Sequence, residues 1–356
     1  MVSSQFVVLY GATGYTGRLV LAEAQRSGLD LILAGRDPQR VSCLARTARM
    51  PFRVAEVNDP DALERLLEGA GVLLNAAGPF SRTAAPLIAA ALHAGVHYLD
   101  VAGEVDVFVH AAELDQRACD ADVMVMPGVG FDVVPTDCLA AHVARKLPQA
   151  HRLHLGISGL QHVSRGSFRT LIQHLGRPIR ARRGGKLVTL PTAASEHLFD
   201  FGAGPRCGCA VDWADIVTAY YSTGVPDVTT YFESTPALQI GLWTRNESAY
   251  VLGLAPVRAC LEMASQWLPE GPTAEQRSNA RAVIVAEAEA PDGRRICARL
   301  ETPDVYAFTA CCAARIASRV ALGHWEPGFQ TPARVFGSEF VLQLPGVVRH
   351  DVSVRN

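Results

Sequence analysis

Short apolar runs and helical periodicities alternate along the first 126 residues of the chain. The run Phe6–Tyr10, for example, is bounded by polar and turn-forming residues, which is typical of a buried strand, whereas apolar positions three and four residues apart indicate helices. The predicted strands are residues 6–10, 29–35, 52–57, 71–75, 98–101 and 122–126, with helices at 38–49, 60–68, 83–94 and 105–118. Strands that alternate with helices predict a parallel, doubly wound sheet, as in a Rossmann domain.

The pattern changes after about residue 150, where predicted strands follow one another with few helices between them. Pro291-Asp-Gly293 separates two apolar segments and is a strong hairpin signal. The predicted strands are 152–158, 186–190, 228–233, 281–290 and 294–301, preceded by a helix at 135–146 and followed by a helix at 306–322 and a helix-then-strand tail at 329–344. This succession predicts an α+β domain with an antiparallel or mixed sheet.

We therefore expect an α/β protein of two domains, for which 356 residues are sufficient. Residues 1–130 should form a Rossmann domain that residues from about 305 to 356 complete. Residues 131–304 should form the α+β domain, which we expect to bind substrate and to take part in dimerisation. A homodimer is the expected oligomer because symmetric dimers are the commonest assemblies.

Composition narrows the classes of partner. A net charge of −2 and a pI near 6.6 give no reason to expect nucleic acid or an anionic membrane. The sequence has no apolar run of membrane-spanning length and no signal-peptide pattern at its N-terminus, so we expect a cytoplasmic protein. Its nine cysteines lack the spacing of a disulfide framework or a metal site, so we expect reduced thiols and no metal.

A glycine-rich turn follows the first predicted strand directly. Gly11-Ala-Thr-Gly14-Tyr-Thr-Gly17 has G-x-x-G-x-x-G spacing between a strand and a helix, which is the context of a dinucleotide-binding loop. Glycines there allow a sharp turn, close approach to a pyrophosphate and tight packing of the helix. A plain structural turn is the alternative. The predicted cofactor-binding residues of this loop are Gly11, Ala12, Thr13, Gly14, Tyr15 and Thr16.

The second predicted strand ends in Gly35-Arg36-Asp37, without the acid that would bind a ribose 2′-hydroxyl. The planar, permanently charged guanidinium of Arg36 suits a 2′-phosphate, so the sequence predicts NADP(H) and not NAD(H). Asp37 would repel that phosphate if it pointed inward. The alternative interpretation of Arg36 is an ordinary surface arginine.

Ligands of doubly wound sheets lie at the carboxyl ends of the strands, and small residues follow the fourth strand there. Backbone at this point can approach the cofactor closely, while Pro79 and Phe80 would form an apolar wall. A tight strand-to-helix turn is the alternative. The residues of this segment that we predict to contact the cofactor are Ala76, Ala77, Gly78, Pro79 and Phe80.

Reduction by a nicotinamide also requires a proton, and titratable residues surround the ends of the fifth and sixth strands. The candidate catalytic residues are Tyr98, Asp100, Glu104 and Asp132. The structural alternatives are a core residue for Tyr98, a helix cap for Asp100 and a turn residue for Asp132. Because Ala102 stands four residues after Tyr98, the tyrosine-lysine pair of short-chain reductases is absent at this place.

A basic run in the second half is a candidate contact for a substrate carboxylate or for the phosphates of a thioester carrier such as coenzyme A. A solvated loop is the alternative. The run consists of Arg177, Arg180, Arg182, Arg183 and Lys186. Two further segments, 164–167 and 213–224, are candidates to line the substrate cleft.

Taken together, several motifs resemble the saccharopine dehydrogenase-like oxidoreductases, including the branch of trans-acting enoyl reductases. These motifs are 11–17, 77–80, 97–104 and 130–137, with 164–166, 213–224 and 329–332 downstream. The resemblance implies an NADP(H)-binding Rossmann domain, in which Gly11, Thr13, Gly14, Tyr15 and Arg36 contact the cofactor, and an α+β domain that closes over the substrate. The G-x-x-G start differs from the G-x-G start of lysine-pathway reductases, which argues against saccharopine itself as the substrate.

The sequence therefore predicts an NADPH-dependent oxidoreductase that reduces a C=N or conjugated C=C bond of a small metabolite or acyl intermediate. A carbonyl reductase is the alternative among enzymes. A protein that binds NADP(H) as a redox signal without turnover is the alternative from another class.

Overall fold

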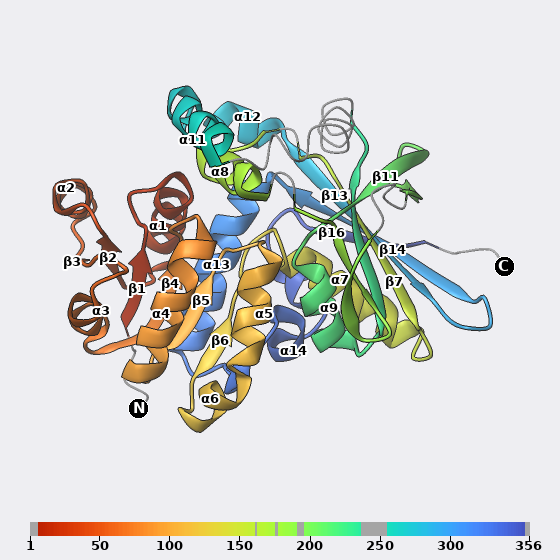
Figure 1. Cartoon of the computed structure of the whole chain (residues 1–356), viewed down its shortest axis with the longest axis horizontal. Coiled ribbons are helices and arrows are strands. Elements are labelled where there is room, and N and C mark those ends of the chain that lie inside the picture. The colour runs from red at the N-terminus through yellow and green to blue at the C-terminus, as the bar shows by residue number, and fades with distance from the viewer. Residues whose placement is uncertain (1–5, 161, 175–176, 191–195, 236–254, 353–356) are drawn as a thin grey trace. The chain divides into compact units, whose positions relative to one another are not determined.

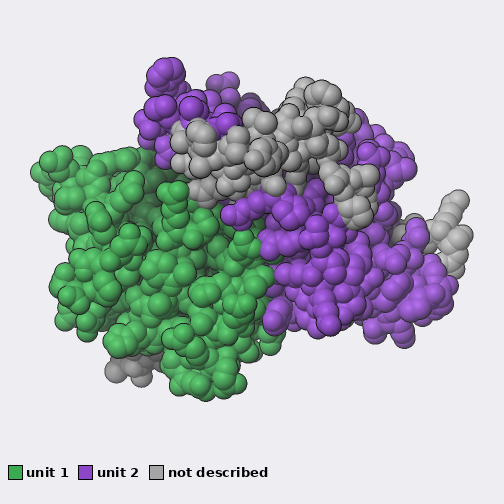
Figure 2. All heavy atoms as spheres, viewed as in Figure 1, with its two compact units in different colours: residues 1–134, 306–340 green, residues 135–305, 341–356 purple. Residues whose placement is uncertain are grey.

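The structure is a computed structural model, and it describes residues 6–160, 162–174, 177–190, 196–235 and 255–352. The chain divides into two compact units, coloured in Figure 2. Unit 1 consists of Met1–Val134 and Tyr306–Phe340, and unit 2 of Pro135–Val305 and Val341–Asn356. Each unit contains its own sheet (Figure 1).

The sheet of unit 1 is parallel throughout, and within the described residues it has seven strands in the order β15-β6-β5-β4-β1-β2-β3. Its strands are β1 Phe6–Tyr10, β2 Leu31–Gly35, β3 Phe52–Val54, β4 Ala70–Asn75, β5 His97–Asp100, β6 Met124–Met126 and β15 Gly328–Phe329. The central strands are built from apolar residues that are almost wholly buried, as both faces of a parallel sheet require. The order reverses between β1 and β4, which places a ligand-binding crevice at their carboxyl ends.

Helices connect these strands. They are α1 Tyr15–Ser27, α2 Pro38–Ala48, α3 Pro60–Leu67, α4 Phe80–Ala94, α5 Val105–Glu113, α6 Asp115–Asp120, α13 Val305–Ala321 and α14 Pro332–Phe336. Proline begins α2 and α3, directly after capping aspartates. The predicted helix 105–118 is in fact two helices, with a break at Leu114, and α4 begins at Phe80, three residues before the predicted start.

Unit 2 contains a mixed sheet with the main order β10-β11-β12-β7-β13-β14-β16, and β8 and β9 lie off this path. Its strands are β7 Arg152–Ser158, β8 Arg180–Arg183, β9 Lys186–Thr189, β10 Glu196–Asp200, β11 Pro205–Val211, β12 Asp227–Glu233, β13 Arg281–Glu289, β14 Arg295–Pro303 and β16 Val348–Val352. Strand β7 pairs in parallel with β12 and antiparallel with β13. The predicted hairpin is present between β13 and β14, and Gly293 has a φ of +87° in its turn.

The helices of this half are α7 Val134–Lys146, α8 Arg165–His174, α9 Asp215–Thr223, α11 Ala255–Ala264 and α12 Ala274–Asn279, with 3₁₀ turns η1 Ser265–Trp267 and η2 Phe340–Gln343. A buried cluster around Phe199 and Tyr231 packs on the sheet. None of the helices in the described residues is long and apolar enough to cross a membrane.

These elements confirm the predicted fold class, an α/β chain with a Rossmann sheet followed by a mixed sheet. The C-terminal boundary differs from our expectation. Residues 306–340 return to unit 1 and add β15 to its sheet, whereas residues 341–356 belong to unit 2. The cause is the pairing of β16 with β14, which ties the last described strand to the second sheet.

Candidate cofactor and proton-donor site

The glycine-rich loop of unit 1 lies against the loop that follows β4. Gly11 has a φ of +83°, and a Cβ there would lie 2.7 Å from the amide nitrogen of Ala77. A Cβ on Gly17 would lie 2.3 Å from the carbonyl oxygen of Gly11. Both glycines are therefore required by conformation or close packing, in addition to any role toward a ligand.

The N-terminus of α1 opens from this loop. Gly14 occupies the cap position, so the cap residue contributes no side chain, and the first turn of α1, all of it within the described residues, carries no acidic side chain. A helix N-terminus carries partial positive charge and presents backbone N–H groups, which suits an anion such as a pyrophosphate. The glycine-rich loop Gly11–Gly17, which we call the glycine cradle, and the start of α1 fit the dinucleotide that the sequence predicts.

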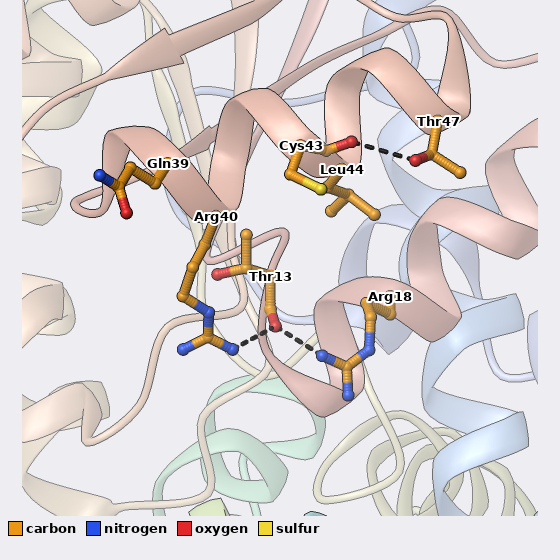
Figure 3. Close-up of a pocket in the computed structure, with 7 residues that line it drawn as sticks. All are labelled: Thr13, Arg18, Gln39, Arg40, Cys43, Leu44 and Thr47. Carbon is orange, nitrogen blue, oxygen red and sulfur yellow. Dashed lines mark hydrogen bonds between the residues drawn. The ribbon is translucent and has the colours of Figure 1, made fainter.

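A hollow of about 450 Å³ lies beside the loop (Figure 3). Its lining residues come from the loop, the first turn of α1 and the length of α2: Thr13, Arg18, Gln39, Arg40, Cys43, Leu44 and Thr47. Arg18 Nη1 and Arg40 Nη2 both donate to the carbonyl oxygen of Thr13, at 2.8 and 3.5 Å. Two guanidinium groups thus converge at one wall of the hollow and make it favourable for an anion.

Arg18 and Arg40 were not named as site residues from the sequence, although their positions near the start of predicted helices could have indicated them. Each lies in the first turns of a helix that begins at the carboxyl edge of a predicted strand, α1 after β1 and α2 after β2. Side chains at such positions face the crevice of a doubly wound sheet. Arginines there could have been named beside Arg36.

Arg36 is exposed at the end of β2, and its charge acts on Tyr10 by lowering a pKa that burial raises more strongly. The next residue, Asp37, is the N-cap of α2, where its Oδ1 accepts hydrogen bonds from the amides of Gln39 and Arg40 at 3.0 Å each. The carboxylate of Asp37 is therefore engaged by the helix end. This orientation removes the concern that Asp37 points toward a phosphate beside Arg36.

The loop after β4 is held by side chains on both sides. Asn75 Oδ1 accepts from the amide of Ala77 at 2.9 Å, and Thr83 Oγ1 donates to the carbonyl oxygen of Ala77 at 2.6 Å. The peptide bond between Gly78 and Pro79 is cis. Phe80 is the first residue of α4, and its amide donates to Glu104 Oε1 at 3.2 Å. The predicted cofactor loop thus contacts one of the predicted acids directly.

Carboxyl groups gather where β5 and β6 end. Asp100 is the last residue of β5, Glu104 precedes α5, and Asp132 follows β6. A Cβ on Gly103 would lie 2.8 Å from Asp132 Oδ2, so this glycine lets the carboxyl pack against the backbone. Asp100 and Asp132 both act electrostatically on Glu104. The structure therefore brings these predicted acids into one cluster.

Burial raises the pKa of each acid in this cluster. The pKa is about 6 for Asp100, about 7 for Asp132 and about 8 for Glu104, and the charges of Asp100 and Asp132 add to the effect of burial on Glu104. Such groups hold or release a proton near neutral pH, as a general acid requires. Glu104 is 3% exposed, whereas Asp132 is partly exposed.

Tyr98 has a different environment. It is completely buried, and its hydroxyl donates to Asp100 Oδ2 at 2.8 Å and accepts from Asn75 Nδ2 at 3.2 Å. Burial and the neighbouring carboxylate raise the pKa of Tyr98 well above its usual range. These contacts place Tyr98 and Asp100 inside the protein, whereas Asp132 is partly exposed.

The basic run of unit 2 is largely engaged in internal contacts. Arg180 forms a two-pronged ion pair with Asp212, with N–O distances of 3.0 Å. Arg182 is 7% exposed, donates to the carbonyl oxygens of Ile216 and Gly185, and lies over the ring of Tyr220. Arg177 precedes β8, and the other residues of the run lie in β8 or at the start of β9, where a solvated loop was the alternative.

The other predicted substrate segments also lie in unit 2. Ser164 and Ser167 hydrogen-bond to each other at the start of α8, and the ring of Trp213 packs against Phe232. Across the described residues, no group of three or more histidine, cysteine, aspartate or glutamate side chains is arranged to hold a metal ion.

Comparison with known proteins assigns a family to the first unit. Residues 7–126 match the family model of the saccharopine dehydrogenase NADP binding domain. This match confirms the resemblance inferred from the motifs and supports NADP(H) as the cofactor. It covers the strands and loops from which the glycine cradle, Arg36, Asp100 and Glu104 come.

Two curated relatives carry the name trans-acting enoyl reductase. The protein from Mycobacterium ulcerans is 34% identical over 148 residues, which are 39% of this chain and 35% of that protein. The protein from Mycobacterium bovis (strain BCG) is 29% identical over 222 residues, 58% of this chain and 52% of that protein. The aligned segments thus span about a third to a half of the relatives' length.

A solved structure matches over nearly the whole chain. Apo saccharopine dehydrogenase (L-Glu forming) from Saccharomyces cerevisiae superposes with a TM-score of 0.64 over 98% of this chain and 100% of that one, at 13% sequence identity. At this identity the likeness establishes the fold of the two units and leaves the substrate open.

Proposed function

We propose, on the premise that residues 7–126 are a saccharopine dehydrogenase NADP binding domain, that the chain is an NADPH-dependent oxidoreductase. The observation that carries this proposal is the contact between the predicted cofactor loop and the acid cluster, through the hydrogen bond from the Phe80 amide to Glu104. A hydride source and groups that titrate near neutral pH would then share one edge of the sheet.

The cofactor would lie across the carboxyl ends of the unit 1 strands. Its pyrophosphate would face the start of α1 at Gly14, and its 2′-phosphate would lie near Arg36, with Arg18 and Arg40 at the adjoining hollow. Charge-assisted hydrogen bonds contribute about 1.5–3 kcal/mol each. Loss of one arginine should therefore weaken NADPH binding by about tenfold to 100-fold.

NADPH, when bound, supplies the hydride. The protein must then deliver a proton, and Asp132 is the best-placed donor because its carboxyl has a pKa of about 7 and it is the most exposed of the four candidate residues. Glu104, with a pKa of about 8, interacts electrostatically with Asp132 and would replace the proton that Asp132 loses. Tyr98 and Asp100 are too enclosed to contact a substrate.

The favoured reaction is reduction of a conjugated C=C bond of an acyl intermediate, because the curated relatives are named enoyl reductases. Reduction of a C=N bond is the second candidate, since the matching solved structure is a saccharopine dehydrogenase. A carbonyl reductase and an NADP(H) sensor remain the alternatives. A homodimer in the cytoplasm that acts on a carboxylate- or thioester-bearing substrate stays a prediction.

Transfer of labelled hydride tests the reaction class. The purified protein is incubated with NADPH that carries deuterium on the nicotinamide and with panels of enoyl thioesters, cyclic imines and carbonyl compounds, and products are analysed by mass spectrometry. We expect deuterium in a reduced enoyl thioester or imine. Asp132→Asn should slow this transfer by about 100-fold or more while NADPH affinity stays the same.

Two results would change the proposal. Deuterium only in alcohols would establish the carbonyl reductase. Tight NADPH binding without transfer to any class of acceptor would favour the sensor.

A further inference from the structure

A continuous chain of hydrogen bonds runs through unit 1, partly buried at Thr83 and Ala77 and buried from Tyr98 to Gly128. At one end, Thr83 and Asn75 hold Ala77 in the loop after β4, and Asn75 Nδ2 also donates to Thr83 Oγ1 at 3.2 Å. Asn75 Nδ2 reaches the Tyr98 hydroxyl on the neighbouring strand, and that hydroxyl donates to Asp100. The chain thus crosses from β4 to β5 entirely through side chains.

At the other end, Asp100 holds the loop after β6. Its Oδ1 accepts from the amides of Ala102 and Gly128 at 2.9 Å each, and its carbonyl oxygen accepts from the amide of Val129 at 2.7 Å. Gly128 lies four residues before Asp132. The bonds therefore link the loop expected to contact the cofactor with the loop that carries the proposed proton donor.

The links have little freedom to rearrange. Asn75, Tyr98 and Asp100 are each 0% exposed, so water cannot easily replace a lost partner. A Cβ on Gly128 would lie 2.5 Å from Val133 Cγ2, which shows how tightly the receiving loop is packed. A displacement of Ala77 should therefore change the hydrogen bond of the Gly128 amide.

We propose that Tyr98 and Asp100 are positioning residues that couple the cofactor loop 76–80 to the acid loop 128–132. Occupation of the first loop by NADP(H) then orders the second, so that the proton donor is in place only when the hydride source is bound. This inference rests on the proposed function, but the coupling itself exists in the protein without cofactor.

The ionisation state of Asp100 should control how firmly the loop after β6 is held. Its ionised carboxyl accepts hydrogen bonds from two amides and the Tyr98 hydroxyl. Each of these bonds lowers the pKa of Asp100, but burial has the larger effect and the pKa is raised to about 6. Protonation below that pH weakens the acceptor and should loosen the amide of Gly128. Loss of the Tyr98 hydroxyl should raise the pKa of Asp100 and shift this loosening to higher pH.

Hydrogen exchange resolved to single amides tests the proposal without any substrate. Tyr98→Phe removes the hydroxyl and keeps the ring. We expect exchange at Gly128 and Ala102 to accelerate by about fivefold to tenfold, and the pH at which Gly128 loosens to rise. Tyr10→Phe is the matched control, because Tyr10 is also buried in unit 1 but its hydroxyl donates to the carbonyl oxygen of Ala55, which is not part of this hydrogen-bonded chain.

A second variant keeps the test decisive if Tyr98→Phe fails to fold. Thr83→Val changes only the far end, and it should accelerate exchange at Gly128 by about threefold or more, although Thr83 does not contact Gly128. Exchange at Gly128 that matches the unsubstituted protein in the folded variants would overturn the coupling.

Addition of NADPH separates this inference from the proposed function. In the unsubstituted protein NADPH should protect both Ala77 and Gly128, and in Tyr98→Phe it should protect Ala77 alone. Protection of Gly128 to the same extent in both proteins would contradict the coupling. If NADPH does not bind at all, the proposed function fails, and the cofactor-free comparison of Thr83→Val still decides the coupling.

Discussion

Two aspartates, one in each unit, show how differently the chain uses the same side chain. Asp132 of unit 1 is packed against Gly103 near other carboxyls, and burial raises its pKa to about 7. Asp351 of unit 2 accepts hydrogen bonds from Lys146 and His142, and these partners lower its pKa to about 2. One carboxyl is suited to exchange a proton near neutral pH, and the other is suited to remain charged.

The difference extends beyond this pair. In unit 1, Asp100 and Glu104 lie with Asp132 and have raised pKa values, whereas in unit 2 charges such as Arg180 and Asp212 are matched with each other. Perturbed pKa values cluster at functional sites, whereas matched pairs more often fix structure. We therefore propose that the proton chemistry takes place in unit 1 and that these unit 2 charges stabilise the fold.

The largest effect should come from the glycine cradle. Gly11→Val adds a branched side chain at a φ of +83°, where a Cβ already meets Ala77. We expect NADPH affinity, measured by nicotinamide fluorescence, to fall by about 100-fold or more. Gly293→Ala in unit 2 is the control, because its φ is +87° but nothing lies within 4 Å of its Cβ. Equal loss of affinity in both variants would refute a specific role for the cradle.

The pH dependence of reduction should follow the acid cluster. A donor must carry its proton, so the rate should be highest below the pKa values of about 7 and 8 and should fall by up to tenfold per pH unit above them. The measurement is the rate of NADPH oxidation with an accepted substrate between pH 5.5 and about 9.5. Asp132→Asn should have a much lower rate, and this rate should no longer decrease at alkaline pH. An alkaline decrease that persists unchanged would point to another donor.

Stability should depend on pH through Glu104. Because the pKa of Glu104 is raised in the folded state, the unfolded state loses this proton first as the pH rises. The free energy of unfolding should therefore decrease between about pH 4.5 and the folded pKa near 8 and stay lower above it. Glu104→Gln should therefore raise the Tm by a few degrees at pH 8.5 and by less at pH 5, as measured by calorimetry. A lower Tm at pH 8.5 would mean that the charged carboxylate is stabilised by its surroundings.

The smallest effect is expected at Asp351. Its folded pKa is lowered, so its contribution to stability is present above about pH 4 and disappears as the pH falls through about 2. Its side chain is 54% exposed, and solvent screening limits the contribution. Asp351→Asn should lower the Tm at pH 7 by about 1–3 °C and leave NADPH affinity unchanged. A rise in the Tm of Asp351→Asn at pH 7 would contradict the contrast between the units.

The sequence predicted the alternation of unit 1 well because each element there has a strong local signal. Phe6–Tyr10 and the glycines after it combine an apolar run with a defined turn. Strands β8, β10 and β11 of unit 2 were missed because they are short or mix polar and apolar residues. Strands β8 and β11 pair with β12, which is distant in sequence, and β10 pairs with β11. The two-residue strand β15 likewise depends on β6.

The site was predicted unevenly for a similar reason. Glu104 and Asp132 were named from their place after strands, but their proximity follows from the fold. The role of Tyr98 was harder to predict, because one partner of its hydroxyl, Asn75, lies on the adjacent strand β4, while the other, Asp100, lies on its own strand β5. Arg18 and Arg40 converge only when α1 and α2 begin beside the same loop.

The most direct test of the central claim is a parallel titration of the protein with NADPH and NADH by nicotinamide fluorescence, with Arg36→Ala and Arg40→Ala beside the unsubstituted chain. Our account predicts that NADPH binds more tightly, and that each variant weakens NADPH by about tenfold to 100-fold while NADH changes little. Equal affinities for the two cofactors, or equal losses for both in the variants, would contradict an NADP(H) site at the glycine loop and arginines of unit 1.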